Sequence, residues 1–307
     1  MLTLENEELI VKIDSQGAEI SSVIDRDSGF EFIWQADEEY WGRHAPVLFP
    51  IVGRLKDHQY EYKGKTYQMS QHGFARDREF EVESSNANTA LFSLSYDEET
   101  LKVYPFKFKL YIRYLLKGNS LSIDYEIVNL SKSEGLYYSI GGHPAFNVSL
   151  DEIDGELDYN ELFLEVAPDR NYKRLPISKE GYVQLHNIQQ VQLNRQQLVH
   201  EDFAEDALVY EILDQSEVIL RDENENVEIR LKPNRMNFIG IWSPYPKKAP
   251  FVCIEPWTGF ADSEKASGKF EEKNEHSFLD KNETMNHGYT ISFLKEKKIH
   301  SIQRWNQ

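Results

Sequence analysis

FKFKLYIRYLLKGNSLSIDYEI, residues 106–127, alternates apolar and polar side chains along nearly its whole length. Successive side chains of a strand point to opposite faces, so this alternation buries one face and leaves the other in solvent. Gly118-Asn119 interrupts the alternation where a tight turn would join two strands. We therefore predict a long antiparallel hairpin with arms from Phe106 to Leu116 and from Leu121 to Ile127.

Further strands are predicted on both sides of this hairpin, because short apolar or alternating runs recur between turn-forming residues. The predicted strands and hairpins occupy residues 2–4, 9–13, 18–24, 30–34, 58–70, 80–82, 90–94, 136–140, 218–231, 238–242 and 251–254. One short helix is predicted at 97–104, and the acidic segment 262–280 is predicted to be a surface loop with at most a short helix. No linker or repeat divides the chain, so we expect a single all-β, mainly antiparallel domain over residues 1–307, built as a large β-sandwich.

Composition and charge narrow the classes of function. A chain of 307 residues, 40 % of them hydrophobic, is long enough to bury a large core. The net charge of −18 argues against a nucleic-acid partner, which would need a basic surface, and against docking on an anionic membrane. A small-molecule partner remains, and the sequence does not indicate the oligomeric state.

Cysteine use and the N-terminus suggest where the protein is found. Cys253 is the single cysteine, so no intrachain disulfide is possible, and its neighbours Phe251, Val252 and Ile254 favour a buried thiol over a nucleophile. The first residues lack the basic and apolar regions of a signal peptide. No run approaches the ~18 apolar residues of a membrane span. We expect a cytoplasmic protein.

The first candidate for chemistry is His143, in the segment Gly141-Gly142-His143-Pro144-Ala145-Phe146-Asn147. The two glycines allow a sharp turn or a close approach to a ligand, and Pro144 restricts the backbone of His143. Histidine exchanges a proton near neutral pH, so a histidine held rigidly at a strand end suits acid–base work. The alternative is a turn histidine that satisfies a backbone group.

Three more candidates for binding or proton transfer lie at the ends of predicted strands. Arg54 follows an apolar strand that ends at Gly53, and its planar fork of donors suits hydroxyl, carboxylate or phosphate oxygens. His72 repeats the pairing of histidine with glycine, with Arg76 four residues later. Asp206 precedes an apolar strand and could accept a hydrogen bond from a hydroxyl group. For each of them a surface or turn role is the alternative.

Glu255 stands at the end of the apolar strand 251–254, and Pro256 is expected to stop that strand. A carboxylate there is costly to bury unless it is paired or functional, and partial burial would raise its pKa toward the range of a useful base. Trp257 could form an apolar wall beside a sugar ring.

Taken together, these residues form an acid–base set with groups that bind hydroxyls. They make a poor metal site, because the histidines are far apart in the sequence and no metal-binding spacing occurs. No nucleotide-binding or nucleophile motif is present either, so we expect neither a metal nor a cofactor.

Five motifs, in this order, resemble the aldose 1-epimerase (galactose mutarotase) family, and within it the LacX-like branch. They are P-V-L-F-P-I-V-G-R (46–54), Q-H-G-F-A-R (71–76), G-H-P-A-F-N (142–147), Asp206 with its strand, and I-E-P-W (254–257). The resemblance runs nearly end to end and implies a large antiparallel β-sandwich with a sugar cleft on one sheet. It also implies a cofactor-independent isomerase that interconverts the α and β anomers of an aldose.

The resemblance assigns roles to residues of this chain. Glu255 looks like the base for the anomeric hydroxyl, His143 like the acid for the ring oxygen, and His72 like a second donor near that oxygen. Arg54 and Asp206 look like hydroxyl binders. Galactose mutarotases carry an Asn-Arg pair where this chain has Gly53-Arg54, and an aromatic residue at the position of Ala145, so a preference for galactose is not implied.

Two alternatives remain open at the level of the sequence. The chain could act on a hexose 6-phosphate, with Arg54 and Arg76 holding the phosphate group. It could also bind or sense a sugar without catalysis, although a paired acid and base is more than a binding protein needs.

Overall fold

The long hairpin lies where the alternation predicts it. The structure is a computed structural model that describes residues 1–296. Strands β9 (Phe108–Lys117) and β10 (Ser120–Asn129) pair antiparallel from Ser120 opposite Lys117 to Asn129 opposite Phe108. Their inward residues, among them Leu110, Ile112 and Ile123, are fully buried, which confirms the prediction of one buried face.

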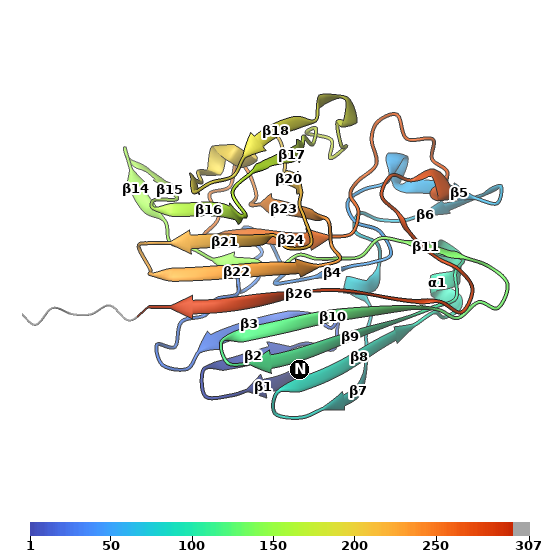
Figure 1. The fold of residues 1–307 in the computed structure, drawn as a ribbon, viewed down its shortest axis with the longest axis horizontal. Helices are drawn as coiled ribbons and strands as arrows, with labels where there is room; N and C mark the ends of the chain where they lie inside the picture. Colours follow the sequence, from blue (N-terminus) through green and yellow to red (C-terminus); the bar gives the residue numbers. More distant parts are fainter. Residues whose placement is uncertain (297–307) are drawn as a thin grey trace, which may run out of the picture.

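This hairpin lies inside a nine-stranded sheet, in the order β19-β16-β21-β22-β26-β10-β9-β8-β7 (Figure 1). All its neighbouring strands are antiparallel. The other strands of this sheet are β7 (Glu81–Ser85), β8 (Thr89–Ser95), β16 (Leu162–Ala167), β19 (Gln196–Gln197), β21 (Glu217–Asp222), β22 (Val227–Asn234) and β26 (Thr284–Lys295).

The second large sheet has the order β18-β17-β20-β23-β24-β12-β4, with β13 also paired to β24. Its strands are β4 (Val47–Leu48), β12 (Gly141–Gly142), β13 (Ala145–Asn147), β17 (Asn171–Leu175), β18 (Gln189–Gln192), β20 (Leu208–Glu211), β23 (Phe238–Trp242) and β24 (Phe251–Trp257). β24 is buried along its whole length, which is typical of a strand covered on both faces.

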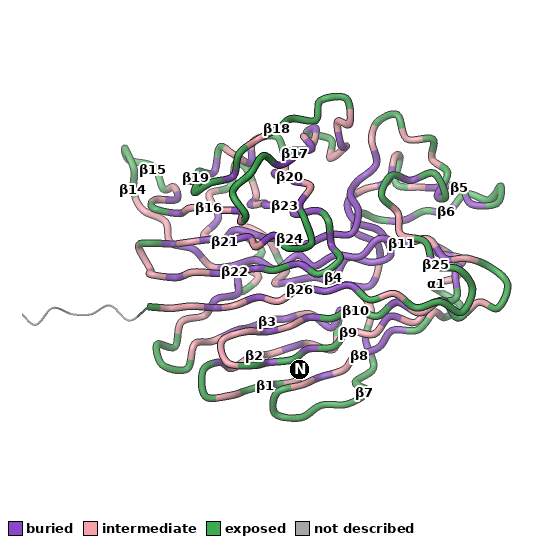
Figure 2. The backbone as a smooth tube through the Cα atoms, viewed as in Figure 1, coloured by how far each residue is buried: buried purple, intermediate pink, exposed green. Residues whose placement is uncertain are grey.

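The two sheets share one apolar core. Val252 and Ile254 of β24 belong to the same buried cluster as Ile229 of β22 and Ile291 of β26. Buried residues run through the middle of the molecule, and exposed residues gather in the loops at its periphery (Figure 2). The fold is therefore the mainly antiparallel β-sandwich that the sequence predicts.

Smaller elements surround the two sheets. The short strands form one triplet and three pairs: β1 (Leu2–Glu5), β2 (Leu9–Ile13) and β3 (Ile20–Asp25); β5 (Gln59–Tyr62) and β6 (Lys65–Gln68); β11 (Leu136–Tyr138) and β25 (Ser277–Leu279); β14 (Asp151–Ile153) and β15 (Glu156–Asp158). The predicted helix is present as α1 (Glu98–Val103), capped by Asp97 through the backbone N–H of Thr100. The 3₁₀ turns are η1 (Lys56–His58), η2 (Ala75–Asp77), η3 (Leu185–Asn187), η4 (His200–Phe203) and η5 (Phe270–Glu272). Within residues 1–296, no helix is long and apolar enough to cross a membrane.

Two local predictions are wrong. Residues 30–34 form isolated bridges at Glu31 and Ile33 and no continuous strand. The apolar run before Gly53 is a strand only at Val47–Leu48, after which the chain bends. In both places the apolar residues are buried although their backbone is irregular. The pattern of apolar residues in a sequence does not distinguish such a buried irregular segment from a strand.

Candidate active site

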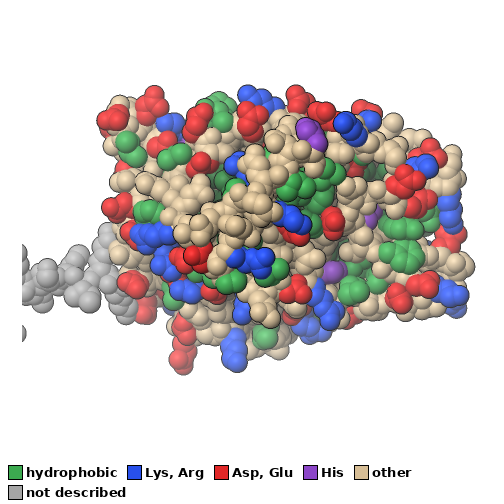
Figure 3. Space-filling model, turned by 45° about the horizontal axis from the view of Figure 1, so that its top comes forward, with side chains coloured by type: hydrophobic (Ala, Val, Ile, Leu, Met, Phe, Trp, Pro, Cys, Tyr) green, Lys and Arg blue, Asp and Glu red, His purple; other side chains and the backbone are tan. Residues whose placement is uncertain are grey.

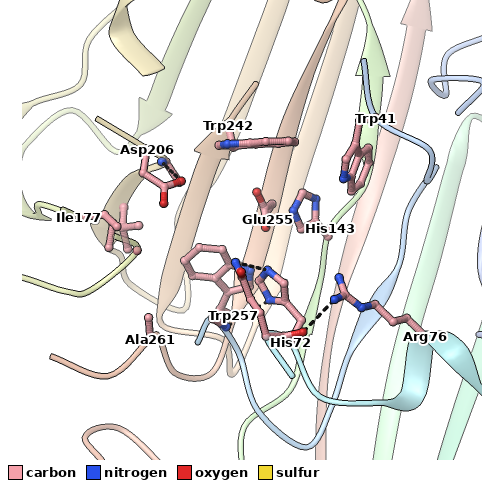
Figure 4. A pocket seen from close by; sticks show the side chains of 15 residues that line it. Trp41, His72, Arg76, His143, Ile177, Asp206, Trp242, Glu255, Trp257 and Ala261 are labelled. Atoms are coloured by element: carbon pink, nitrogen blue, oxygen red, sulfur yellow. Dashed lines mark hydrogen bonds and ion pairs between the residues drawn. The ribbon is translucent and has the colours of Figure 1, made fainter. Parts of the chain in front are cut away.

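A pocket of about 260 Å³ lies on the second large sheet, the one that contains β24, on the face turned away from the shared core. Its polar lining side chains are Gln71, His72, Arg76, His143, Asp206 and Glu255, and three tryptophans form much of its walls (Figure 4). The volume is below the roughly 300–1,000 Å³ typical of sites for drug-sized ligands, so a small ligand fits best. In a space-filling view, hydrophobic side chains gather in a hollow of the molecule while acidic and basic side chains alternate around it (Figure 3).

Strand β24 supplies the carboxyl group of the pocket. Side chains alternate along a strand, so Cys253, Glu255 and Trp257 share the pocket face while Val252 and Ile254 join the core. Glu255 is only 2 % exposed and pairs in register with Gly240 of β23.

The prediction that Pro256 stops this strand is wrong, because β24 continues to Trp257. The N–H of Ile254 donates to Pro144 O at 3.2 Å, and the N–H of Thr258 donates to Ile140 O at 2.9 Å. Pro256 lies between these two residues on the same edge of β24, opposite the turn that separates β12 from β13. Proline, which has no N–H, is tolerated there because the strand on that side is interrupted and offers no regular partner at this position.

His143 occupies that interruption. Its backbone N–H donates to Pro46 O at 3.1 Å, which fixes the turn between β12 and β13. The two preceding glycines are strand residues whose role is close approach. A Cβ on Gly142 would lie 2.3 Å from the Tyr289 hydroxyl, and one on Gly141 would lie 2.6 Å from Cδ1 of Trp257.

The structure brings His143 and Glu255 together. Nε2 of His143 lies 3.1 Å from Oε2 of Glu255, and the two side chains are 8 % and 2 % exposed. Burial raises the pKa of Glu255 well above its ordinary value, the charge of Asp206 raises it further, and the nearby Trp257 N–H opposes the rise. Burial also lowers the pKa of His143 to about 3. Burial therefore favours the uncharged form of each side chain.

His72 is arranged as a neutral hydrogen-bond donor. Its Nδ1 accepts a hydrogen bond of 3.1 Å from the Gly53 N–H, which leaves the ring proton on Nε2. Burial, followed by the proximity of His143, lowers the pKa of His72 well below its usual value. Its backbone is left-handed, with φ of 67°, an uncommon conformation for a residue with a side chain. The turn thus directs a donor whose charge does not change near neutral pH.

Arg76 and Asp206 line different parts of the pocket (Figure 4). Nη2 of Arg76 donates to Gln71 O at 2.8 Å. Oδ1 of Asp206 accepts from the Ala207 N–H at 2.7 Å, and burial raises the pKa of this carboxyl group. Both positions predicted from the sequence therefore reach the pocket, as does Trp257.

Arg54 lies outside the lining set. Its guanidinium carbon is 4.5 Å above the ring of Tyr182, Nη1 donates to Glu180 O, and Nη2 lies 3.2 Å from Nε2 of His58. Its side chain passes Gly181, which does line the pocket. The structure therefore places Arg54 at the rim, against the loop that covers this end of the pocket. Gly53 lines the pocket, whereas Ala145 is fully buried behind it, so only the first of the two departures from galactose mutarotases alters the wall.

The motifs gave no indication of two pocket residues, Trp41 and Trp242. Their rings lie 4.8 and 5.7 Å from the imidazole of His143. Trp41 precedes Arg43-His44-Ala45-Pro46 and Trp242 ends β23, so both are close in sequence to segments that build the site. This closeness in sequence to site-building segments is the signal that could have indicated both tryptophans.

The thiol of Cys253 also lies near the pair. Three atoms that could bind a metal, one each from Cys253, His143 and Glu255, lie within 4.8 Å of one another. The spacing of these residues in the sequence does not reveal this proximity. The thiol is fully buried among apolar side chains, and burial raises its pKa well above the ordinary value, so it keeps its proton. This confirms the prediction of a buried thiol. The absence of a metal stays a prediction.

Comparisons with known proteins show the family of the chain. A sequence profile described as aldose 1-epimerase matches residues 1–292. The chain belongs to the aldose 1-epimerase family. It is therefore an isomerase by family, and its partner is a small-molecule sugar.

Individual relatives narrow the branch of the aldose 1-epimerase family. The plasmid and chromosomal forms of protein LacX from Lactococcus lactis subsp. lactis are each 32 % identical over 300 residues, covering 95 % of this chain and 99 % of LacX. A galactose mutarotase related enzyme from Lactobacillus acidophilus has a similar structure, with TM-score 0.91, 39 % identity and coverage of 97 % of this chain and 98 % of that one. A galactose mutarotase-like protein from Lactobacillus casei ATCC 334 is also similar, with TM-score 0.89, 30 % identity and coverage of 96 % of this chain and 100 % of that one. The predicted resemblance to the LacX-like branch is confirmed.

Proposed function

We propose that this aldose 1-epimerase interconverts the α and β anomers of a neutral aldohexose by acid–base catalysis with its own side chains. The observation that carries the proposal is the buried contact of 3.1 Å between His143 Nε2 and Glu255 Oε2 inside a pocket of single-sugar size. A base and an acid side by side are what the opening of a sugar ring requires, because one proton leaves O1 while another reaches O5.

In the proposed mechanism, Glu255 removes the proton from the anomeric hydroxyl and His143 donates a proton to the ring oxygen. The C1–O5 bond breaks, C1 becomes an aldehyde, and rotation about C1–C2 exposes the other face of the carbonyl group. Ring closure then reverses both proton transfers. Nε2–H of His72, which lies 3.3 Å from the side-chain amide of Gln71, can donate a further hydrogen bond to an oxygen of the sugar.

The electrostatics of the pair suit the middle of this cycle. The step starts from ionised Glu255 and protonated His143, and it ends with both groups neutral. Burial favours the neutral pair, which is the state that accompanies the open-chain sugar. Each group acts once as acid and once as base in a turnover, so neither has to exchange protons with solvent.

The charges in the pocket support a neutral substrate over a sugar phosphate. Among residues 1–296, Arg76 is the one lining residue with a lysine or arginine side chain, and it already donates to Gln71 O. Arg43 is paired with Asp77 at 2.8 Å, and Arg54 is held at the rim. Since Asp206 and Glu255 share this pocket, a phosphate dianion would meet more acidic than basic side chains.

Anomer exchange followed by NMR, with glucose, galactose and glucose 6-phosphate side by side, tests the proposal. We expect faster exchange of at least one neutral aldohexose than of glucose 6-phosphate. If the phosphorylated sugar exchanges fastest, the alternative of a hexose-6-phosphate 1-epimerase replaces the proposal. If neutral sugars raise the melting temperature while exchange stays at the rate of the buffer, the protein is a sugar-binding protein.

His72→Ala is expected to reduce kcat about 10²-fold, the usual cost of removing one donor from a pre-organised site. The loss should be the same at pH 7 and pH 9, because the pKa of His72 is already well below its usual value and the ring stays neutral over this range. The pH dependence of kcat for both proteins measures this. A loss that changes with pH would show that His72 works in a charged form.

Three expectations from the sequence stay predictions: that no cofactor takes part, that the chain forms one domain, and that the protein is cytoplasmic. The oligomeric state is open as well. The proposed mechanism needs no group beyond the side chains of the pocket.

A further inference from the structure

The imidazole of His143 lacks a usual means of orientation. Its Nδ1 is buried and makes no hydrogen bond to another residue in the described part of the chain. His72, in the same pocket, has its Nδ1 fixed by the Gly53 N–H at 3.1 Å. A histidine that takes part in proton transfer is normally oriented by a partner on its second nitrogen. Apart from the backbone of His143 itself, no polar group among residues 1–296 fixes Nδ1, so packing around the ring has to hold its plane.

Aromatic rings surround this imidazole. Trp41 stacks on it with ring centres 4.8 Å apart and an angle of 27° between the planes, while Trp242 meets it edge-on at 5.7 Å and 83°. Figure 4 shows His143 between Glu255 on one side and Trp41 on the other. Trp41 is itself held in place, since its carbonyl oxygen accepts from Nε1 of Trp34 at 2.9 Å and its ring stacks on Phe251 at 5.9 Å.

We propose that Trp41 is a positioning residue for His143, with its indole face fixing the plane of the imidazole so that Nε2 stays directed at Glu255 and the pocket. The inference rests on the proposed function for its catalytic consequence. Its structural part, that Trp41 sets the orientation and surroundings of the ring, stands without it.

Rotation about χ2 shows why a flat neighbour matters. This torsion is broad and roughly two-fold for histidine, and a half-turn puts Cε1 where Nε2 was. Such a ring could neither contact Glu255 through nitrogen nor transfer a proton to the pocket. A stacked indole disfavours rotations out of the stacked plane, which would swing Nε2 away from Glu255, and it keeps water from one face of the ring. The half-turned ring keeps the same plane and is disfavoured by the loss of the contact between Nε2 and Glu255.

The groups that can influence the charge of His143 come from several elements. Glu255 faces it from β24 and His72 lies 5.7 Å away ring to ring. Arg43 and Arg76 disfavour its protonation at longer range. Because burial is the main cause of the low pKa of His143, hydration after loss of the indole should move this pKa back toward its ordinary value.

Two substitutions separate a flat face from apolar bulk. Trp41→Leu keeps an apolar side chain without a planar face, and we expect kcat to fall about 10²-fold, the scale of a misplaced catalytic group, with KM nearly unchanged. Trp41→Phe keeps a ring to stack and should retain most of the rate. If Trp41→Leu raises KM and leaves kcat intact, Trp41 is a platform for the sugar and the proposal is wrong.

Nitrogen NMR of the His143 ring gives a readout that does not depend on activity. We expect Trp41→Leu to shift the ring nitrogens of His143 and raise its pKa, and Trp41→Phe to leave both near the wild type. Ile177→Val is the control, because Ile177 lines the pocket on the side away from His143 (Figure 4) and carries no polar group. An unchanged His143 spectrum in Trp41→Leu overturns the inference, whereas a wild-type protein with no exchange activity overturns the proposed function alone.

Discussion

Glu255→Gln is expected to reduce anomer exchange by about 10²–10⁴-fold and, at neutral pH, to make the folded protein more stable. The loss of rate follows from the role proposed for the carboxyl group, since a positioned acid or base contributes this much to catalysis. Glutamine has the same shape but neither accepts a proton from O1 nor returns one. His143 would remain in place without its partner for proton exchange.

The gain in stability follows from the burial of the same group. Burial raises the pKa of Glu255 in the folded protein above its unfolded value of 4.5. The unfolded chain therefore ionises first as the pH rises, and the stability of the wild type falls between pH 4.5 and the folded pKa, by at most about 1.4 kcal/mol per pH unit. Glutamine does not titrate, so the advantage of Glu255→Gln is small at pH 4 and grows toward pH 8.

Urea unfolding of wild type and Glu255→Gln at pH 4, 6 and 8 measures this difference. Glu7→Gln, at an exposed position in the turn between β1 and β2, is the control and should change the free energy of unfolding little at any pH. A pH-independent difference between Glu255→Gln and the wild type would show that folding does not oppose ionisation of Glu255. Full activity of the variant would remove Glu255 from the mechanism.

The parts of the fold that the sequence predicts well are those with a strict period. Alternation over 106–127 places β9 and β10 to within two residues, because one buried face imposes a period of two. The same approach fails at residues 30–34, where apolar residues are buried without a ladder, and at Pro256, where a break in the neighbouring chain permits proline. Such failures depend on partners distant in the sequence, which no local pattern contains.

The site shows the same division. His72, His143 and Glu255 could be found because glycine or proline stands beside each of them at a strand end, and Asp206 because it precedes an apolar strand; the pocket brings all four together. The stacking of Trp41 on His143 depends on a loop about 100 residues earlier in the chain. Whether the Arg54 guanidinium lies in the pocket or on the ring of Tyr182 depends on a few side-chain torsion angles, which the sequence does not specify. The lowered pKa of His143 and the raised pKa of Glu255 follow mainly from burial, which appears only in the assembled fold.

The second large effect is expected in the acidic segment 262–280, whose relation to the pocket the sequence left open. Most of this segment is exposed, as predicted, but Lys273 and Asp262 form an ion pair of 2.9 Å with side chains only 2 % and 6 % exposed. Lys273 Nζ also donates to Phe260 O at 2.7 Å, and the Lys56 N–H donates to Asp262 Oδ2 at 2.9 Å. The Asp262 backbone bonds to Arg54 O and to the Val183 N–H. Asp262 and Lys273 therefore join this acidic segment to two other parts of the protein, at residues 54–56 and at Val183.

Lys273→Met should lower the free energy of unfolding by about 3–5 kcal/mol, because it leaves the Asp262 carboxylate buried without its cation. Lys269→Met is the matched control within the same segment: Lys269 pairs with Glu272 at 3.0 Å, but these side chains are 56 % and 52 % exposed, so a loss below about 1 kcal/mol is expected. Urea unfolding compares the two variants. Equal losses would mean that the buried pair contributes no more than a surface pair.

Removing both charges distinguishes an unpaired ion from lost packing. Lys273→Met combined with Asp262→Asn leaves no buried charge at this position, so the double variant should be more stable than Lys273→Met alone. Ala261, next to Asp262, lines the pocket and lies against Gly53, so Lys273→Met should also raise KM for the sugar more than it lowers kcat. A double variant no more stable than the single one would assign the loss to packing of the lysine side chain. The buried pair would then hold the pocket wall through its methylene groups, with its charges playing no net part.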